Sequence, residues 1–368
     1  MPLKLNLGSR PASLFRISQC HSGVRSRFQS TSSTVPNHRR HLDRAKSNHH
    51  NQQSPHVETV VGDISLDSFR KSAWIPETPL LLRASQNFPA IQKWFQYGND
   101  SSHTGFSHYM KAFEDIVLPY ELTVTHGSRP SSLGSEENIL LEFLRWLRES
   151  QEYKDSYLPV VVEAIIQSIG SKPQPDENPL KFQQLDAPLS LIMSACQFNK
   201  TRNDPAECIK NLYVAQSNLS FLPEPLTQYL PVPDIVKHAG KGDIYSSSIW
   251  LGLQPTYTPL HRDPNPNLFC QLVSSKKVRL MTPSQGDGIY ARVRRELGSY
   301  GNSRFRGAEM MGGRERELLH HAVWDNVPVD EVSLDSGDAL FIPKGWWHSV
   351  ASGGKEGELN ASVNWWFR

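Results

Sequence analysis

Cysteine is scarce in this sequence: four are present among 368 residues, and no two of them form a Cys-x-x-Cys pair. This spacing excludes a zinc module built on paired thiolates and offers no disulfide framework, so a reducing compartment is expected. Net charge is also nearly absent, because 39 lysines and arginines are set against 37 aspartates and glutamates. A general affinity of the whole chain for nucleic acid or for an anionic membrane surface is therefore not expected.

Long hydrophobic runs are missing as well. The most apolar helix-like stretch, Val160 to Ile169, is too short to cross a bilayer and contains Glu163 and Gln167. We therefore expect a soluble protein that does not insert into a membrane.

The N-terminal segment lacks acidic residues. Residues 1–42 contain no aspartate or glutamate, whereas seven lysines and arginines are spread among many serines. Organelle-import presequences have this composition, and residues 25–32, with two arginines before an aromatic residue and a run of small hydroxyl residues, resemble a mitochondrial processing region. We predict that residues 1–56 form a disordered mitochondrial targeting segment. A polar tail on a cytoplasmic or nuclear protein is the alternative.

Mixed helix and strand patterns begin near Val57. Strands are predicted at Pro79–Arg83 and Pro119–Thr125, and helices at Ile64–Arg70, at Phe88–Phe95 and from Ser135 onwards. We interpret residues 57–180 as a helical and strand-containing part that packs on the core.

After about Tyr213 the pattern changes to short strands separated by glycine and proline, which predicts a closed sheet or sandwich for the core, residues 181–368. The predicted strands are Tyr245–Leu251, Pro259–Asp263, Leu268–Val273, Lys276–Met281, Asp338–Ile342 and Ala361–Phe367. Residues 284–328 interrupt them with an Arg/Gly/Glu-rich insertion. We interpret it as a long excursion over the surface, with a cover over the mouth of the site as one role.

Three side chains in the core form a candidate metal site. In an extended strand, His261 and Asp263 project to the same side, so one metal ion can bind both. A single His-x-Asp pair is about as frequent as chance predicts, so an ordinary surface strand is the alternative to a metal site. His348 raises the significance, because it follows an apolar strand and turn that would fix its imidazole in a dry wall. Two imidazoles and a carboxylate on one face of Fe(II) leave positions open for a chelating 2-oxo acid and for oxygen.

A 2-oxo acid with a second carboxylate also needs a cation. Residues 268–281 read as a hairpin that turns at Ser274-Ser275, and on its return strand Lys276 shares a side with Val278 and Leu280. A buried lysine is costly without a counter-charge, so Lys276 is either an anion anchor or an outward-facing residue of a strand in another register. We favour the anchor. The residues that complete it are the hydroxyl donors Thr258 and Tyr213 and the amide of Asn267, for which a turn residue is the alternative.

These stretches resemble a known family. From Tyr213-Val-Ala-Gln through Thr258-Pro-Leu-His-Arg-Asp-Pro to Lys276, and again from Gly337 to His348, the sequence is similar to JmjC-domain, cupin-like oxygenases that depend on Fe(II) and 2-oxoglutarate. The small hydroxylases of asparaginyl and arginyl side chains are the most similar members. The resemblance implies a mainly β fold, with a double-stranded β-helix (cupin or jelly-roll) core and flanking helices.

The resemblance also implies roles for individual residues. The implied iron ligands are His261, Asp263 and His348. The implied 2-oxoglutarate contacts are Lys276, Thr258, Tyr213 and Asn267. Trp250 and Glu121 match positions that face the substrate in the arginyl hydroxylases, although a core aromatic and a solvated strand residue are the alternatives.

The implied activity is hydroxylation of a side chain of a protein substrate, with 2-oxoglutarate and O2 converted to succinate and CO2. Three alternatives stay open: demethylation of lysine in histones or other proteins, hydroxylation of a tRNA base, and a metal-binding pseudoenzyme. An RNA substrate would use the arginines of the insertion for its phosphates: Arg292, Arg294, Arg295, Arg304 and Arg306. The insertion has no matching motif in the family, so it leaves the substrate undecided.

We predict that the first 50 residues direct the protein to mitochondria, since basic, acid-free and serine-rich segments have the composition of import presequences. Imaging of C-terminal fluorescent fusions checks this. The fusion of the whole chain should enter mitochondria and the fusion lacking residues 1–50 should not; entry of the truncated fusion would contradict the prediction.

Overall fold

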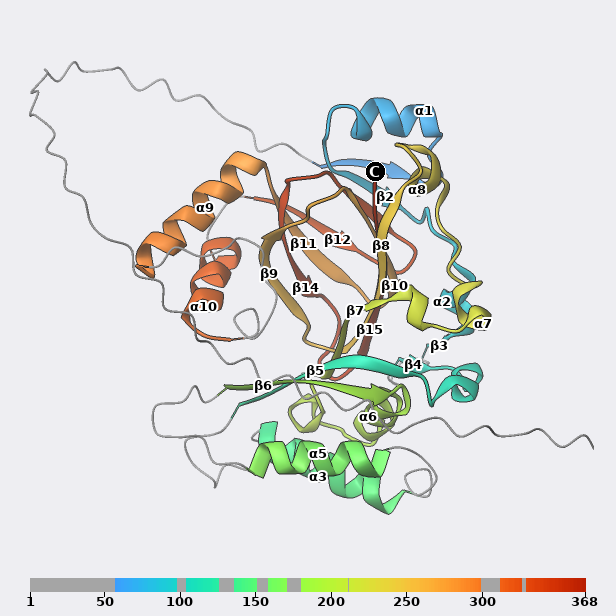
Figure 1. Cartoon of the computed structure of the whole chain (residues 1–368), viewed down its shortest axis with the longest axis vertical. Helices are drawn as coiled ribbons and strands as arrows, with labels where there is room; N and C mark the ends of the chain where they lie inside the picture. Colours follow the sequence, from blue (N-terminus) through green and yellow to red (C-terminus); the bar gives the residue numbers. More distant parts are fainter. Residues whose placement is uncertain are drawn as a thin grey trace, which may run out of the picture. The chain divides into compact units, whose positions relative to one another are not determined.

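Two facing β-sheets form the core of the protein (Figure 1). The structure, a computed structural model, describes residues 57–97, 104–125, 136–150, 158–170, 180–210, 212–298, 312–325 and 329–368. The targeting segment expected over residues 1–56 lies outside the described residues, so that boundary stays a prediction.

The larger sheet contains nine strands among the described residues and runs in the order β1-β2-β13-β10-β15-β8-β7-β5-β6. In chain order the strands are β1 (Glu58–Val61), β2 (Leu80–Arg83), β5 (Val117–Thr125), β6 (Leu180–Pro188), β7 (Leu212–Asn218), β8 (Ile244–Leu253), β10 (Asn267–Val273), β13 (Ala339–Ile342) and β15 (Leu359–Phe367). Strands from the N-terminal part thus extend the sheet at both ends. The β5–β6 ladder is nine residue pairs long and joins the core through β7.

In the described part of the chain the smaller sheet has four strands in the order β12-β11-β14-β9, all antiparallel. Its strands are β9 (Tyr257–Arg262), β11 (Lys276–Met281), β12 (Asp330–Leu334) and β14 (Trp347–Ser352). Alternation along β11 sends Val278 and Leu280 into a buried cluster shared with Phe269 and Leu340 of the larger sheet, so the two sheets enclose an apolar interior. Opposed, mostly antiparallel sheets around one core are the jelly-roll architecture predicted for this chain.

The structure corrects one step of the strand prediction. β10 and β11 do not form a hairpin: β10 pairs with β13 and β15, whereas β11 pairs with β12 and β14. The chain passes from one sheet to the other at Ser274, which has a positive φ of 61°. Lys276 is nevertheless buried, because its side depends on alternation within β11 and not on the identity of the partner strand.

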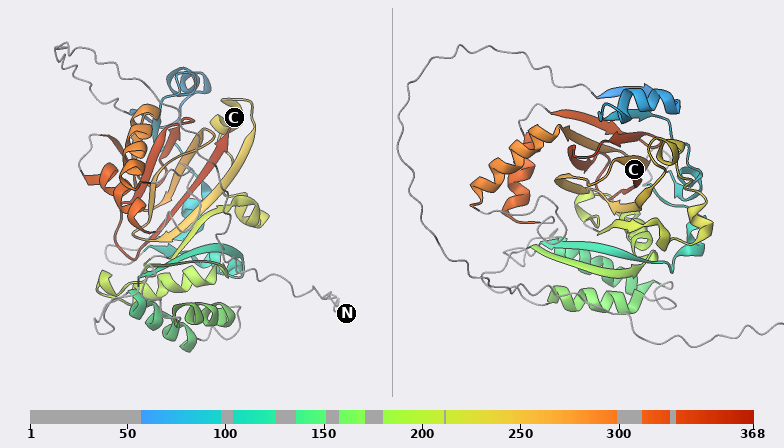
Figure 2. Two further views of the ribbon diagram at one scale, coloured as in Figure 1. Left: turned by 60° about the vertical axis from the view of Figure 1, so that its left-hand side comes forward. Right: turned by 45° about the horizontal axis from the view of Figure 1, so that its top comes forward.

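Helices cover the outer faces of both sheets (Figures 1 and 2). In chain order the first helices are α1 (Leu66–Phe69), η1 (Arg70–Trp74), α2 (Pro89–Lys93), η2 (His108–Phe113), α3 (Glu136–Glu149), α5 (Leu158–Gly170) and α6 (Ser190–Lys200). Short turns follow at η3 (Pro205–Glu207), η4 (Leu219–Phe221), α7 (Glu224–Thr227) and α8 (Asp234–His238), and a two-strand ribbon pairs β3 (Phe95–Gln96) with β4 (Gly105–Phe106). Nowhere in these described stretches is a helix both long enough and apolar enough to cross a bilayer.

The described parts of the insertion are helical, which the prediction of a surface excursion missed. It begins at once with α9 (Pro283–Glu296), followed by α10 (Arg314–His320) and the π-helical turn η6 (His321–Asp325). A capping box begins α9: Thr282 accepts from the Gln285 N–H, and the Gln285 side chain accepts from the Thr282 N–H. These described parts pack on the outer face of the smaller sheet.

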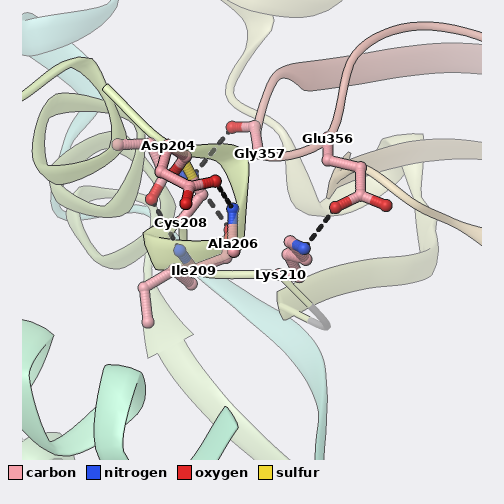
Figure 3. A network of polar contacts seen from close by, with 8 residues as sticks. Asp204, Ala206, Cys208, Ile209, Lys210, Glu356 and Gly357 are labelled. Carbon is pink, nitrogen blue, oxygen red and sulfur yellow. Dashed lines mark hydrogen bonds and ion pairs between the residues drawn. The ribbon is translucent and has the colours of Figure 1, made fainter. Parts of the chain in front are cut away.

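Polar contacts join the segment that leads into β7 to the loop before β15 (Figure 3). The fully buried Asn199 donates to the carbonyls of Ile209, at 2.9 Å, and Gly357, at 2.8 Å, and accepts from the Ile209 N–H. Lys210 forms an ion pair with Glu356 beside it. Segments about 150 residues apart in sequence are thereby joined where β7, one wall of the site described below, begins.

Candidate metal centre and anion pocket

The structure brings together the three side chains predicted to bind iron. His261 on β9 is paired with His348 on β14, and Asp263 follows the end of β9 by one residue. The two imidazole centroids are 4.1 Å apart, and the His348 Nε2 lies 3.6 Å from a carboxylate oxygen of Asp263. One potential ligand atom from each residue lies within 4.8 Å of the others, which is the arrangement that a single metal ion requires.

A β-bulge in β9 sets the direction of His261. Pro259 and Leu260 lie opposite the single residue Ser349, so the register shifts between the His261–His348 pair and the pair of Thr258 with Val350. Residues three apart in a regular strand point to opposite sides. The extra residue reverses this alternation, and it therefore places Thr258 and His261 on the same inner face.

Hydrogen bonds at Nδ1 orient both imidazoles. The His261 Nδ1 lies 2.8 Å from the carbonyl oxygen of Pro259, and the His348 Nδ1 lies 3.4 Å from that of Trp346. When Nδ1 donates its proton to a carbonyl, the lone pair is on Nε2, the atom left for a metal. Burial, and then the neighbouring His261, hold the pKa of His348 well below its usual value, so its imidazole is neutral and able to coordinate at neutral pH.

The metal-facing carboxylate is held by a chain of amides. The Asn267 Nδ2 donates to Asp263 at 2.9 Å, Asn364 donates to the Asn267 Oδ1 at 3.0 Å, and the Trp250 Nε1 donates to the Asn364 Oδ1 at 2.8 Å. Asn267 thus contacts the predicted metal ligand directly, and its role toward 2-oxoglutarate stays a prediction. Trp250 is thus linked to Asp263 through two amides, and its role toward the substrate stays a prediction.

Three residues of β15 also belong to the inner face of the larger sheet: Ser362, Asn364 and Trp366. The sequence alone assigned no role to Trp366. The three residues alternate along β15, and Trp366 lies opposite Asn267 in register. Within the described ranges the indole N–H of Trp366 has no hydrogen-bond partner, and only 8% of the residue is exposed. The signal was present in the alternation of Ser362, Asn364 and Trp366 but could be interpreted only once the facing strands were known.

Lys276 provides a test of whether an anionic ligand fits. The residue is 3% exposed, and its Nζ donates to Ser362 at 3.1 Å. No carboxylate in the described part of the chain forms an ion pair with it. Burial lowers its pKa from 10.5 to about 7. A buried cation of this kind is stabilised by an incoming anion, so the residue fits the carboxylate of a 2-oxo acid.

The aromatic wall beside Lys276 contains the predicted hydroxyl donor Tyr213. The Lys276 Nζ lies 6.0 Å from the Tyr213 ring centroid and 5.3 Å from that of Phe269. The Tyr213 ring packs on Trp250 and passes close over Gly252, where a Cβ atom would lie only 2.4 Å from the ring. Burial raises the pKa of Tyr213 well above its usual value, so its hydroxyl stays protonated and can donate.

Glu121 lies next to this wall. It is paired with Tyr213 across β5 and β7 and accepts a hydrogen bond from Gln184 at 3.4 Å. Burial raises its pKa, and the Gln184 bond offsets part of the increase. A carboxylate that has lost part of its hydration gains from a cationic partner.

The structure describes three of the five arginines in the predicted cluster, and Arg292 and Arg295 are exposed on α9. Arg294 forms an ion pair with Glu315, at 2.6 Å, with both side chains largely buried. Arg304 and Arg306 lie outside the described residues.

Comparison with known proteins identifies the class to which this fold and site belong. The family model for the cupin-like domain matches residues 66–368. The match spans most of the chain, so the chain belongs to the family of cupin-like domains, and the resemblance to JmjC-type proteins is confirmed.

Several similar proteins are named for a JmjC domain or as lysine-specific demethylases. The chain is 30% identical over 112 residues to the JmjC domain-containing protein D of Dictyostelium discoideum, covering 30% of this chain and 23% of the relative. It is 28% identical over 159 residues to the Jumonji C domain-containing protein 5 of Drosophila melanogaster, covering 42% and 37%. It is 29% identical over 157 residues to a protein of Danio rerio named lysine-specific demethylase 8, covering 42% and 36%. The matches thus span well under half of each of these relatives.

We predict that Lys276→Met raises the stability of the protein while it weakens 2-oxoglutarate binding by at least ~100-fold, because it removes a desolvated charge that only the ligand compensates. Thermal unfolding and calorimetric titration with 2-oxoglutarate measure the two effects. Lys277→Met, on the exposed side of the same strand, is the matched control and should change neither. A loss of stability in Lys276→Met would show that the lysine already has a partner.

The same site predicts a pH dependence. The folded-state pKa of about 7 lies below the ordinary value of 10.5, so between these values the unfolded chain binds more protons and stability rises with pH. Bound dianion favours the charged lysine, so affinity for 2-oxoglutarate should fall by up to ~10-fold per pH unit above 7, with proton uptake on binding. Calorimetry at pH 8 in buffers of different ionisation enthalpy measures that uptake; its absence would contradict the assignment.

Proposed function

We propose that this protein is an Fe(II)- and 2-oxoglutarate-dependent dioxygenase that hydroxylates a side chain of a protein substrate. One observation carries the proposal: two imidazoles and a carboxylate converge within 4.8 Å inside a barrel that also buries a lysine with no ion-pair partner in the described residues. The first set suits Fe(II) with open positions, and the lysine suits the far carboxylate of 2-oxoglutarate.

Each residue of the site has a task in this reaction. His261, Asp263 and His348 would hold Fe(II), which when bound activates O2 for the oxidative decarboxylation of 2-oxoglutarate and the oxidation of a substrate C–H bond. Lys276 neutralises the buried carboxylate of the co-substrate, and Ser362 fixes the direction of its ammonium group. The amide of Asn267 keeps Asp263 in position. The apolar interior shared by the two sheets excludes water from the reacting groups.

The wall formed by Glu121, Tyr213 and Trp250 supports a cationic substrate side chain. A partly desolvated carboxylate gains from pairing with a cation, and the aromatic faces of Tyr213 and Trp250 attract one. Arginine, lysine and N-methylated lysine share this chemistry. Because relatives of this chain are named lysine-specific demethylases, oxidation of an N-methyl group is the second candidate, and it uses the same site.

The oxygenase assignment predicts formation of succinate from 2-oxoglutarate by the purified protein with Fe(II), even without the primary substrate. His261→Ala should reduce this turnover by at least ~100-fold, because it removes one of three ligands. His238→Ala, an exposed histidine on α8, is the matched control and should behave as wild type. Absence of iron-dependent succinate in wild type, together with absence of 2-oxoglutarate binding by calorimetry, would refute the proposal.

The substrate assignment predicts that Glu121→Gln raises the KM for arginine- or lysine-containing peptides by ~10-fold or more, since a charge-assisted contact is lost. Mass spectrometry of peptide libraries containing arginine, lysine and N-methyl-lysine measures the products, and a gain of 16 Da separates hydroxylation from a loss of 14 Da by demethylation. Glu58→Gln, an exposed strand carboxylate on β1, is the matched control. Equal KM values for wild type and Glu121→Gln would exclude this residue from substrate recognition.

A further inference from the structure

The insertion contacts the metal-binding wall from its outer side. α9, α10 and η6 bury a cluster on the smaller sheet that includes Leu260, Met281 and Trp347. Leu260 and Trp347 directly precede His261 and His348 and point away from the interior. The helices therefore lie against the back of the two histidine strands, on the side opposite the site (Figure 2).

A hydrogen-bond chain reaches from the insertion to the bulge that orients His261. The indole N–H of Trp324, in η6, donates to the Ser349 hydroxyl at 3.0 Å, and that hydroxyl donates to the Thr258 carbonyl at 2.8 Å. Ser349 is fully buried and is the single residue that faces the two bulged residues of β9. Its hydroxyl thus closes the bulge from β14, and Trp324 completes the hydrogen bonding of that hydroxyl.

Arg279 fastens η6 to the sheet at the same position. It is paired with Ser349 across β11 and β14, and its guanidinium donates to the Val323 carbonyl at 2.6 Å. The guanidinium also lies 4.7 Å from the centroid of Trp324. Glu331 of β12 accepts from the Nε atom at 2.7 Å, which holds the guanidinium plane in place. The position of the Trp324 indole is therefore determined by the sheet that it supports.

A second contact supports the other end of the histidine pair. Asp287 of α9 accepts hydrogen bonds from the Trp347 Nε1 and from Arg262, both at 3.1 Å. Trp347 and Arg262 form the register pair next to the His348–His261 pair, at the end of the ladder. Gly286 permits this close approach, because a Cβ atom there would lie 2.0 Å from the Trp347 ring. The Arg262–Asp287 pair is half exposed, so its role here is to set direction and not to supply stability.

We propose that the helical insertion is a brace for the metal centre, and that Ser349 and Trp324 are positioning residues that keep His261 and His348 at the separation a metal ion needs. The inference rests on the proposed function for the identity of the metal site. It assigns the described part of the insertion to metal geometry rather than to cover over the substrate entrance. Groups that orient metal ligands commonly change metal affinity by 10–100-fold when they are removed.

The test is a titration of the full-length protein with Co(II), which reports on the site through its visible absorption without any turnover. Ser349→Ala removes the hydroxyl that closes the bulge, and Trp324→Phe removes the N–H donor while it keeps an aromatic ring in contact with Arg279. We expect Ser349→Ala to weaken Co(II) binding by ~10–100-fold and to shift its absorption bands, and Trp324→Phe to do the same to a smaller extent. Ser190→Ala in α6, a buried serine whose hydroxyl has no partner among the described residues, should leave both readouts at wild-type values.

The outcomes separate the brace from the proposed function. If wild type binds Co(II) and both variants bind it with the same affinity and the same spectrum, the brace is refuted, even when the variants melt at a lower temperature. If Ser349→Ala does not fold, Trp324→Phe decides the matter. If wild type itself does not bind Co(II), the metal site and with it the proposed function fail.

Discussion

The antiparallel pairing of β9 with β14 is the constraint on which the site depends. It places His261 opposite His348, and the bulge across from Ser349 turns Thr258 to the same face. Asp263 follows the end of β9 by one residue and, two positions after His261, projects to the same side as His261. A shift of one residue in this ladder would send one imidazole to the outer face, since neighbouring strand residues point to opposite sides. The packing of the insertion against the outer face opposes such a shift.

Placing charge and amides inside an apolar barrel has a cost that the structure offsets unevenly. The amides of Asn267 and Asn364 satisfy each other and the carboxylate of Asp263. Lys276, by contrast, has a single hydrogen-bond partner, the Ser362 hydroxyl, among the residues that the structure describes. Satisfied polar groups hold a site rigid, whereas an uncompensated buried cation stores binding energy for an anion. The polar groups near the metal site are therefore held rigidly by hydrogen bonds, whereas Lys276 is left to be compensated by an anionic ligand.

Much of the fold was predicted from local sequence patterns, and the errors in that prediction have identifiable causes. Lys276 was correctly predicted to be buried because alternation is a property of one strand, but the hairpin with β10 was wrong because partner choice depends on strands far away in sequence. The helices of the insertion were missed although Thr282, Pro283 and Gln285 form a capping signal. The density of arginine and glycine in that segment obscured it.

The sequence by itself determined the donor set: which imidazoles and carboxylate sit on strands at usable spacing, and which lysine shares a side with apolar residues. Only the tertiary structure decided how these groups meet. The 84 residues between Asp263 and His348 had to return through both sheets before the ligand atoms converged. The bulge at Pro259-Leu260, the link from Trp250 to Asp263 and the contact of Trp324 with Ser349 likewise depend on strand register and packing, which no local periodicity encodes.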